Sequence, residues 1–145
     1  MESKWWSGID KEGRQAMSLT SKQLSAAPPR RTRLREICEQ FPEVNVEAVG
    51  DQHIAFRIRK RIFAYYLFDH HGDGIIGFTC KSSLSEQRRL VRNDPETFFV
   101  PSYLGPRGWI AIRLDLDEVD WETVAELARR AYLDLAPRKL AALVE

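Results

Sequence analysis

The sequence has few of the features that identify a membrane, secreted or metal-binding protein. It holds two cysteines in 145 residues, Cys38 and Cys80, and neither belongs to a CxxC pair. Both lie in segments patterned with apolar residues, so we expect buried free thiols rather than a disulfide or metal ligands. No apolar run approaches the roughly 20 residues of a membrane-spanning helix, and the N-terminus lacks the apolar core of a secretory signal. We therefore expect a cytoplasmic protein with no membrane contact.

The motifs of common enzyme classes are also lacking. The chain has no GxSxG nucleophile elbow, no Walker phosphate loop and no GxGxxG fingerprint. Asp69, His70, His71 and Asp73 stand together, but neighbouring loop residues rarely converge on one metal ion, and we interpret them as a solvated turn. We interpret His53, at the start of an expected strand, as structural. The expectation is a non-enzymatic protein with no catalytic residue, no cofactor and no metal.

The composition is that of an ordinary folded domain, with 43% apolar and 30% charged residues. A net charge of +1 argues against a protein that coats polyanions over its whole surface. The charges are unevenly spread, because residues 57–113 hold ten Lys and Arg against five acids, while residues 114–145 hold four against eight. An asymmetry of this kind favours one positive face.

The chain divides into a flexible N-terminal arm, residues 1–29, and a single domain, residues 30–145. The arm lacks a sustained apolar period and ends in Pro28 and Pro29. Trp5 and Trp6 are its exception, and we interpret them as docked on the domain or disordered, with a partner-binding role as the alternative. Their role and the oligomeric state stay open.

Residues 30–145 read as an α+β domain. Apolar spacing predicts a first helix from Arg30 to Pro42, capped by Thr32, and alternation predicts strands with one solvated face. Ser83 and Glu86 have capping-box spacing for a middle helix. The strands are expected at 44–50, 53–59, 62–68, 75–81 and 109–114 with a short extended piece at 96–101, and the later helices at 84–92, 117–136 and 138–145. This order predicts two layers, an antiparallel sheet covered by helices.

The stretch between Tyr103 and Trp109 is a candidate site. Gly105-Pro106-Arg107-Gly108 has the composition of a tight turn that displays Arg107 at its tip, with Gly108 left-handed before the next strand. The two flanking rings are suited to bracketing a flat or cationic group, or to stacking on an exposed base. The alternative is that both rings simply cover the end of the core.

Arginines form a second candidate surface. Alternation places Arg57, Arg59 and Arg113 away from the core, but whether they share a face with the others depends on strand order. If they align, phosphate contacts would make binding strongly salt-dependent; the alternative is a merely solvated face. The candidate nucleic-acid-binding residues are Arg57, Arg59, Arg61, Arg88, Arg92, Arg107 and Arg113.

From about Leu34 to Leu140 the chain resembles the MmcQ/YjbR family of small bacterial proteins. The segments that carry the resemblance are RIFAYYLF, the TCK strand end, VPSYLGPRGWIAIRLD and WETVAELARRAYLDLAP, with Pro101, Tyr103, Trp109 and Tyr132 at the family's landmark positions. The resemblance implies a secretion-chaperone-like fold, α-β(3)-α-β(2)-α in two layers. It also implies a DNA-binding protein whose two β wings contact the duplex.

One departure from the family pattern affects the binding prediction. Members often have a basic loop of the N-K-x-H-W type before the tryptophan, whereas here LGPRGW holds one charge, Arg107. The leading hypothesis is therefore double-stranded DNA binding by backbone contacts that rest mainly on the other arginines. The alternatives are a protein- or peptide-binding module, and a small-molecule binder that uses Tyr103, Arg107 and Trp109.

Overall fold

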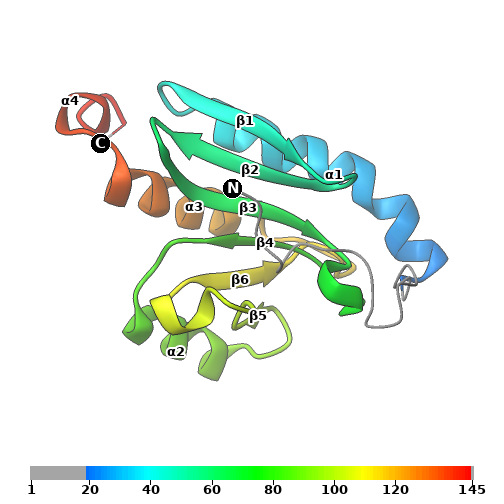
Figure 1. Cartoon of the computed structure of the whole chain (residues 1–145). Helices are drawn as coiled ribbons and strands as arrows, with labels where there is room; N and C mark the ends of the chain where they lie inside the picture. The colour runs from blue at the N-terminus through cyan, green and yellow to red at the C-terminus, as the bar shows by residue number, and fades with distance from the viewer. Residues whose placement is uncertain (1–18, 145) are drawn as a thin grey trace.

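The computed structural model describes residues 19–144, which form an antiparallel sheet with helices on one face (Figure 1). The sheet order is β1-β2-β3-β4-β6-β5, and every neighbouring pair is antiparallel. The strands are β1 (Val44–Val49), β2 (His53–Ile58), β3 (Arg61–Phe68), β4 (Ile76–Cys80), β5 (Phe98–Phe99) and β6 (Ile110–Arg113). The helices are α1 (Ser21–Glu39), α2 (Leu84–Asn93), α3 (Trp121–Leu135) and α4 (Arg138–Ala141), with short 3-10 turns η2 (His70–Gly72) and η3 (Gly105–Arg107).

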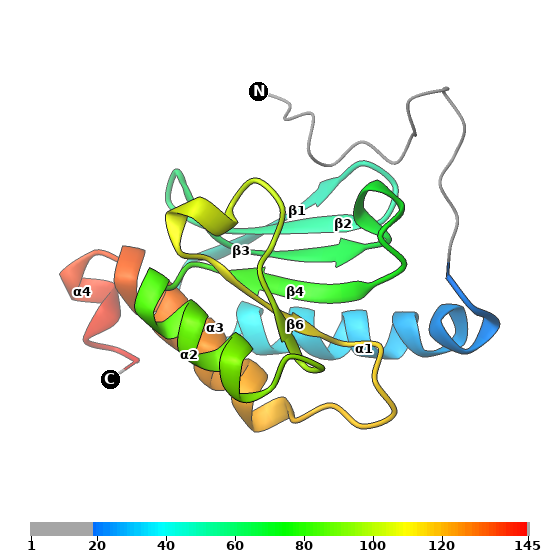
Figure 2. The same ribbon diagram turned by 90° about the horizontal axis from the view of Figure 1, so that it is seen from below.

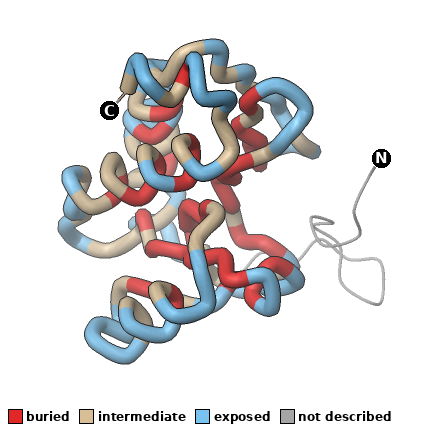
Figure 3. The backbone as a smooth tube through the Cα atoms, turned by 90° about the vertical axis from the view of Figure 1, so that its left-hand side faces the viewer, coloured by how far each residue is buried: buried red, intermediate tan, exposed pale blue. Residues whose placement is uncertain are grey.

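The main core lies between the sheet and the helices. Figure 2 shows α1, α2 and α3 on the same side of the sheet. Ile54, Phe56 and Ile58 alternate along β2 and are fully buried against this layer. The apolar stripe of α3 closes the core from the other side through Val124 and Ala128, both buried. In Figure 3 the buried residues accordingly concentrate in the central strands and the inner faces of the helices.

The predicted α+β class and two-layer arrangement are confirmed, with one correction to the topology. Four strands precede α2, as the residue pattern predicted with its strand at 75–81, whereas the α-β(3)-α-β(2)-α order implied by the resemblance has three. The additional strand is β4, which follows η2 and pairs with both β3 and β6, for example through Cys80 opposite Ala64 and Ile110. It occupies the middle of the sheet, so it belongs to the core of the fold.

The first helix begins earlier than the sequence pattern predicted, so the end of the expected arm at residue 29 is wrong. Thr20, rather than Thr32, caps α1 in a capping box with Gln23, and Pro28 and Pro29 lie inside the helix. Interior prolines oppose a helix locally. Tertiary contacts hold this one, because Gln23 donates to the Asp115 carboxylate at 2.6 Å and Arg30 donates to the Leu114 carbonyl at 2.6 Å. Trp5 and Trp6 lie outside the described residues.

The face of the sheet opposite α1 and α3, here called the outer face, is not the fully solvated face that the alternation predicted. Ala55 on β2 is completely buried, and Tyr65 on β3 is 7% exposed. Leu104 and Trp109, from the segment that precedes β6, pack on them in a second apolar cluster. The outer face therefore carries a lid made by residues 101–109.

Two further expectations can be compared with the described residues. Cys38 and Cys80 are free and buried, as predicted, and burial raises the pKa of both thiols. Within residues 19–144 no helix is both long and apolar enough to span a bilayer.

Candidate nucleic-acid interface

The 101–109 segment has the turn that its sequence predicted. Pro106 lies in the single 3-10 turn η3, and Gly108 follows with φ of +92°, a left-handed conformation that favours glycine. The Gly108 amide donates to the Gly105 carbonyl at 2.9 Å and closes the turn. Arg107 is exposed at its tip.

Helix α2 holds the 101–109 segment in place through hydrogen bonds and close packing. The buried side-chain amide of Gln87 donates to the Gly105 carbonyl at 2.9 Å and to the Trp109 carbonyl at 2.6 Å. Gly108 abuts the start of the helix, since a Cβ there would lie 2.9 Å from the Leu84 backbone nitrogen. The sequence analysis missed Gln87, because a lone polar residue in a helix gives no signal of a tertiary contact.

The two rings that flank the turn do not act together. Trp109 is 7% exposed and packs beside Tyr65, with ring centroids 5.9 Å apart, so it belongs to the lid cluster. Tyr103 is 63% exposed. The burial of Trp109 argues against the prediction that Tyr103 and Trp109 bracket a ligand, and the alternative that a ring covers the core holds for Trp109 alone.

Arg57 and Arg107 both lie within electrostatic range of the Tyr65 hydroxyl on the outer face. Burial raises the pKa of this hydroxyl to about 12; the positive charges of Arg57 and Arg107 oppose that rise, and the charge of Glu47 adds to it. Two arginines that are fifty residues apart in the chain thus act on one hydroxyl. The sheet order decides this proximity, which the sequence could not provide.

Several candidate arginines have carboxylate partners. Arg57 pairs with Glu47 at 3.0 Å and Arg59 with Glu43 at 2.9 Å, with all four side chains at least 32% exposed. Exposed pairs of this kind contribute little to stability, and competing anions readily exchange with them. These two arginines stay accessible at the β2–β3 hairpin.

Arg113 is held more firmly by its carboxylate partner than Arg57 and Arg59 are. Its guanidinium donates to both oxygens of Asp115, at 2.8 and 3.0 Å, and the Asp115 side chain is completely buried. Burial opposes ionisation of Asp115, but the bonds from Arg113, the Ile76 amide and Gln23 hold its pKa below the usual range. Arg113 is thus a structural residue rather than a free phosphate contact.

The remaining candidates lie at two places. Arg61 begins β3 at the hairpin, and Arg88 and Arg92 are exposed on α2, on the helical side of the sheet. Within residues 19–144, these three arginines form no ion pair with a carboxylate, and the same is true of Arg107. The seven arginines therefore come from separate parts of the fold. Arg57 and Arg107 lie toward the outer face, whereas Arg59 is within electrostatic range of Tyr132 on α3 and Arg61 lies opposite the inward-facing Ile58. Arg88 and Arg92 lie on α2, and Arg113 is held by Asp115.

The histidine turn is more buried than expected. Asp69 and His70 are 5% and 3% exposed, so the interpretation as a solvated turn is wrong for them. The Gly74 amide donates to the Asp69 carboxylate at 2.8 Å, which folds the turn back on the sheet end. Burial, together with the charges of His71 and His53, lowers the pKa of His70 to about 3. The described part of the chain has no group of three or more His, Cys, Asp or Glu arranged to hold a metal ion.

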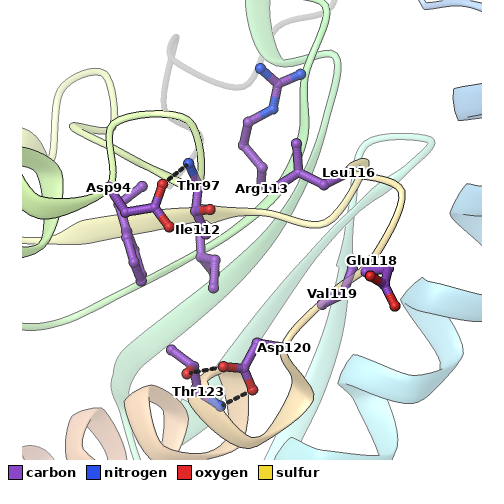
Figure 4. Close-up of a pocket in the computed structure, with 10 residues that line it drawn as sticks. Asp94, Thr97, Ile112, Arg113, Leu116, Glu118, Val119, Asp120 and Thr123 are labelled. Atoms are coloured by element: carbon purple, nitrogen blue, oxygen red, sulfur yellow. Dashed lines mark hydrogen bonds between the residues drawn. The ribbon is translucent and has the colours of Figure 1, made fainter.

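A small hollow of about 150 Å³ lies on the other side of β6, between the β5 region and the start of α3 (Figure 4). Its lining includes the apolar side chains of Phe98 and Ile112 and the carboxylates of Asp94 and Asp120. Both carboxylates already accept bonds from their own turns: Asp94 from the Thr97 amide, and Asp120 from the backbone and hydroxyl of Thr123. None of the residues predicted for small-molecule binding lines this hollow.

Comparison with known proteins identifies the family. The model of the YjbR family matches residues 39–133, which include β1 to β6 and most of α3. The chain belongs to the YjbR family. This confirms the resemblance found in the sequence, and three landmark positions, Pro101, Tyr103 and Trp109, lie in the lid segment of this YjbR domain.

Among solved structures, the crystal structure of protein DR2400 of Deinococcus radiodurans, which contains the domain DUF419, is similar to this YjbR chain. The TM-score is 0.62 and the sequence identity 20%, over 79% of this chain and 86% of that one. At this identity the similarity shows a common fold. No curated protein matches the sequence.

Proposed function

We propose that this YjbR-family protein binds DNA, without a catalytic role, through phosphate contacts made by the β2–β3 hairpin and the tip of the 101–109 segment. The observation that carries the proposal is that Arg57 on β2 and the exposed Arg107 of the lid both stand at the outer face, within electrostatic range of Tyr65. Arg59 and Arg61 stand at the end of the same hairpin, with Arg61 opposite Ile58. The family resemblance, which implies a DNA-binding protein with β wings, supports the same direction.

The charge balance predicts weak and sequence-independent binding. Arg61 and Arg107 have no carboxylate partner among the described residues, whereas Glu47 and Glu43 neutralise Arg57 and Arg59. Each phosphate contact contributes about −0.9 to the slope of log K against log salt. Two free arginines therefore predict a slope of about −2, and release of the two paired ones would bring it toward about −4.

The experiment is a fluorescence anisotropy titration of a duplex of about 20 base pairs at about 50 and 200 mM salt. Arg107→Gln should weaken binding at low salt and make the slope shallower by about one. Arg35→Gln is the matched control, because Arg35 lies on α1 and pairs with Glu39, away from the outer face. Absence of duplex binding at the lower salt concentration would overturn the proposal.

A charge-releasing variant gives a second, independent readout. Glu47→Gln removes the carboxylate that holds Arg57 and leaves the guanidinium in place. Affinity for the duplex should rise and the salt slope should steepen by about one. Glu118→Gln removes the same charge at the hollow beside α3, and it should change duplex binding far less. Equal effects of both substitutions would show that total charge alone governs binding.

A protein-docking role has one specific observation in its favour. Leu84, Val100 and Tyr103 are 42%, 51% and 63% exposed, which is unusual for large apolar side chains. Leu84 and Val100 border the two glycines of the turn, since a Cβ at Gly105 would lie 2.4 Å from Val100 Cγ1. If this role is correct, Val100→Ser should abolish partner binding while Arg107→Gln leaves it intact.

A further inference from the structure

Two exposed rings meet at the edge of the lid. Tyr103, in the 101–109 segment, and His71, in η2, have ring centroids 5.8 Å apart and planes inclined by 49°. Thirty-two residues separate them in the chain, and both residues are exposed. The sequence analysis assigned Tyr103 to a pair with Trp109, so this pairing depends entirely on the tertiary structure.

Both residues have a backbone conformation that non-glycine residues rarely adopt. Tyr103 has φ of +66° and His71 has φ of +56°. Left-handed residues with a Cβ are strained, and they persist where the surrounding structure fixes them. Here the Gly105 amide bonds the Pro101 carbonyl at 2.9 Å on one side, and the Asp69 carboxylate fixes η2 on the other. Both side chains are exposed, so neither contributes to the core in return for this strain.

A row of three histidine rings supports the Tyr103–His71 pair from the interior of the domain. His71 lies 4.3 Å from His70, centroid to centroid, and His70 lies 5.6 Å from His53. His70 and His53 are buried, and a ring nitrogen of His53 is 3.2 Å from the Phe68 carbonyl. His71, at the exposed end of this row, is therefore held in place before a ligand binds, which lowers the entropic cost of binding.

We propose that Tyr103 and His71 form a stacking platform for an unpaired DNA base, while Arg107, four residues after Tyr103, contacts a neighbouring phosphate. The inference rests on the proposed function and makes the substrate class more specific: DNA with unpaired bases, such as a gap or a single-stranded end. Base stacking on aromatic rings tolerates every base, because each has a π-face. Two exposed rings, and an arginine four residues along the chain that has no carboxylate partner among the described residues, supply the two components of single-strand binding.

The experiment compares a fully paired duplex with the same duplex carrying a short gap, in anisotropy titrations at one salt concentration. The wild type should prefer the gapped DNA by about tenfold, and Tyr103→Ala should remove that preference. Tyr103→Phe keeps the ring and should retain it, whereas Tyr103→Leu keeps only apolar bulk and should lose it. His71→Ala should reduce the preference in the same direction.

A spectroscopic measurement tests stacking directly. With 2-aminopurine placed in the gap, binding of the wild type should quench its fluorescence, and binding of Tyr103→Ala should not. The melting temperature of each variant verifies that it folds. Because Tyr103 is largely exposed, its substitution should change the melting temperature little.

The outcomes separate the two proposals. Equal affinity for gapped and paired DNA, with no effect of Tyr103→Ala, would overturn the platform and leave backbone binding standing. Loss of gap preference in Tyr103→Ala, with residual salt-dependent binding to both DNAs, would support both proposals. Absence of binding to either DNA would overturn both.

Discussion

The Gln87 side-chain amide donates to the Trp109 carbonyl at 2.6 Å, inside the joint between α2 and the 101–109 segment. The same nitrogen donates to the Gly105 carbonyl, so one buried amide satisfies two carbonyls of the lid. Because Trp109 packs on Tyr65, this contact couples the helix on one side of β6 to the aromatic cluster on the outer face. The position of Arg107 depends on that joint.

Replacing Gln87 with methionine should therefore destabilise the domain. Methionine keeps the volume but has no donor, and buried carbonyls that lose a partner cost about 1–3 kcal/mol. We expect a loss of about 2 kcal/mol in the free energy of unfolding, measured by urea denaturation. Arg88→Ala truncates an exposed side chain at the next position of the helix, and it should change the free energy of unfolding by less than about 0.5 kcal/mol. Similar values for the two variants would show that the amide contributes nothing specific.

Gly108→Ala tests the turn itself. The left-handed φ already disfavours alanine, and its Cβ would lie 2.9 Å from both Leu84 N and Ser83 C. Backbone strain and crowding together should lower the free energy of unfolding by about 3 kcal/mol. Gly50 has φ of +61° but nothing within 4 Å of an added Cβ, so Gly50→Ala isolates the conformational part at about 1 kcal/mol. An equal cost at both glycines would contradict the close packing at α2.

Asp115→Asn tests the buried network that fixes the start of α1. The carboxylate accepts bonds from Arg113, Gln23 and the Ile76 amide, and an uncharged amide would leave these donors poorly matched. We expect a loss of about 3 kcal/mol, since breaking a buried charged pair costs several times a neutral hydrogen bond. Asp117→Asn removes an exposed pair with Lys22 and should lower the melting temperature far less than Asp115→Asn does. Thermal unfolding of both variants gives the comparison.

His70 should make stability depend on pH. Burial and the charges of His71 and His53 lower its pKa to about 3, below the ordinary value of 6.5, so the folded state favours the neutral ring. Its contribution is complete above about pH 6.5 and is lost as pH falls from there toward about 3. Near pH 5 the loss should be about 2 kcal/mol, in addition to any from His53, whose pKa burial also lowers.

The measurement is the urea midpoint of the wild type and of His70→Gln between about pH 7 and pH 5. The wild type should lose stability faster than the variant, which lacks the titrating ring. His71→Gln removes one of the charges that lower the His70 pKa, so it should weaken the acid transition only in part. Parallel curves for the wild type and His70→Gln would show that His70 does not govern the acid transition.

Local patterns predicted most elements, because each is specified by residues near in sequence. The Ser83 hydroxyl accepts from the Glu86 amide at 3.2 Å, which is one of the two bonds of the predicted capping box, and the β2 alternation buries Ile54, Phe56 and Ile58. The start of α1 was missed because two prolines argue against a helix locally, while Asp115, far away in the chain, holds it through Gln23.

The candidate site could be predicted only in part. Arg107 was correctly placed at an exposed turn tip, since Pro106 and Gly108 specify that turn between them. The partner of Tyr103 could not be inferred, because it depends on where the end of β3 lies relative to the lid. The ion pair that neutralises Arg57 was missed as well, since Glu47 reaches it across the β1–β2 ladder.

The sequence by itself determined the α+β class, the turn that displays Arg107 and the YjbR resemblance, because hydrophobic period, turn chemistry and motif order are local properties. Only the tertiary structure decided which arginines are neutralised, that Trp109 is buried, and that Tyr103 meets His71. The physical reason is that strand order and register bring together groups that are ten to more than forty residues apart, and the interactions between neighbours in the chain do not specify those contacts.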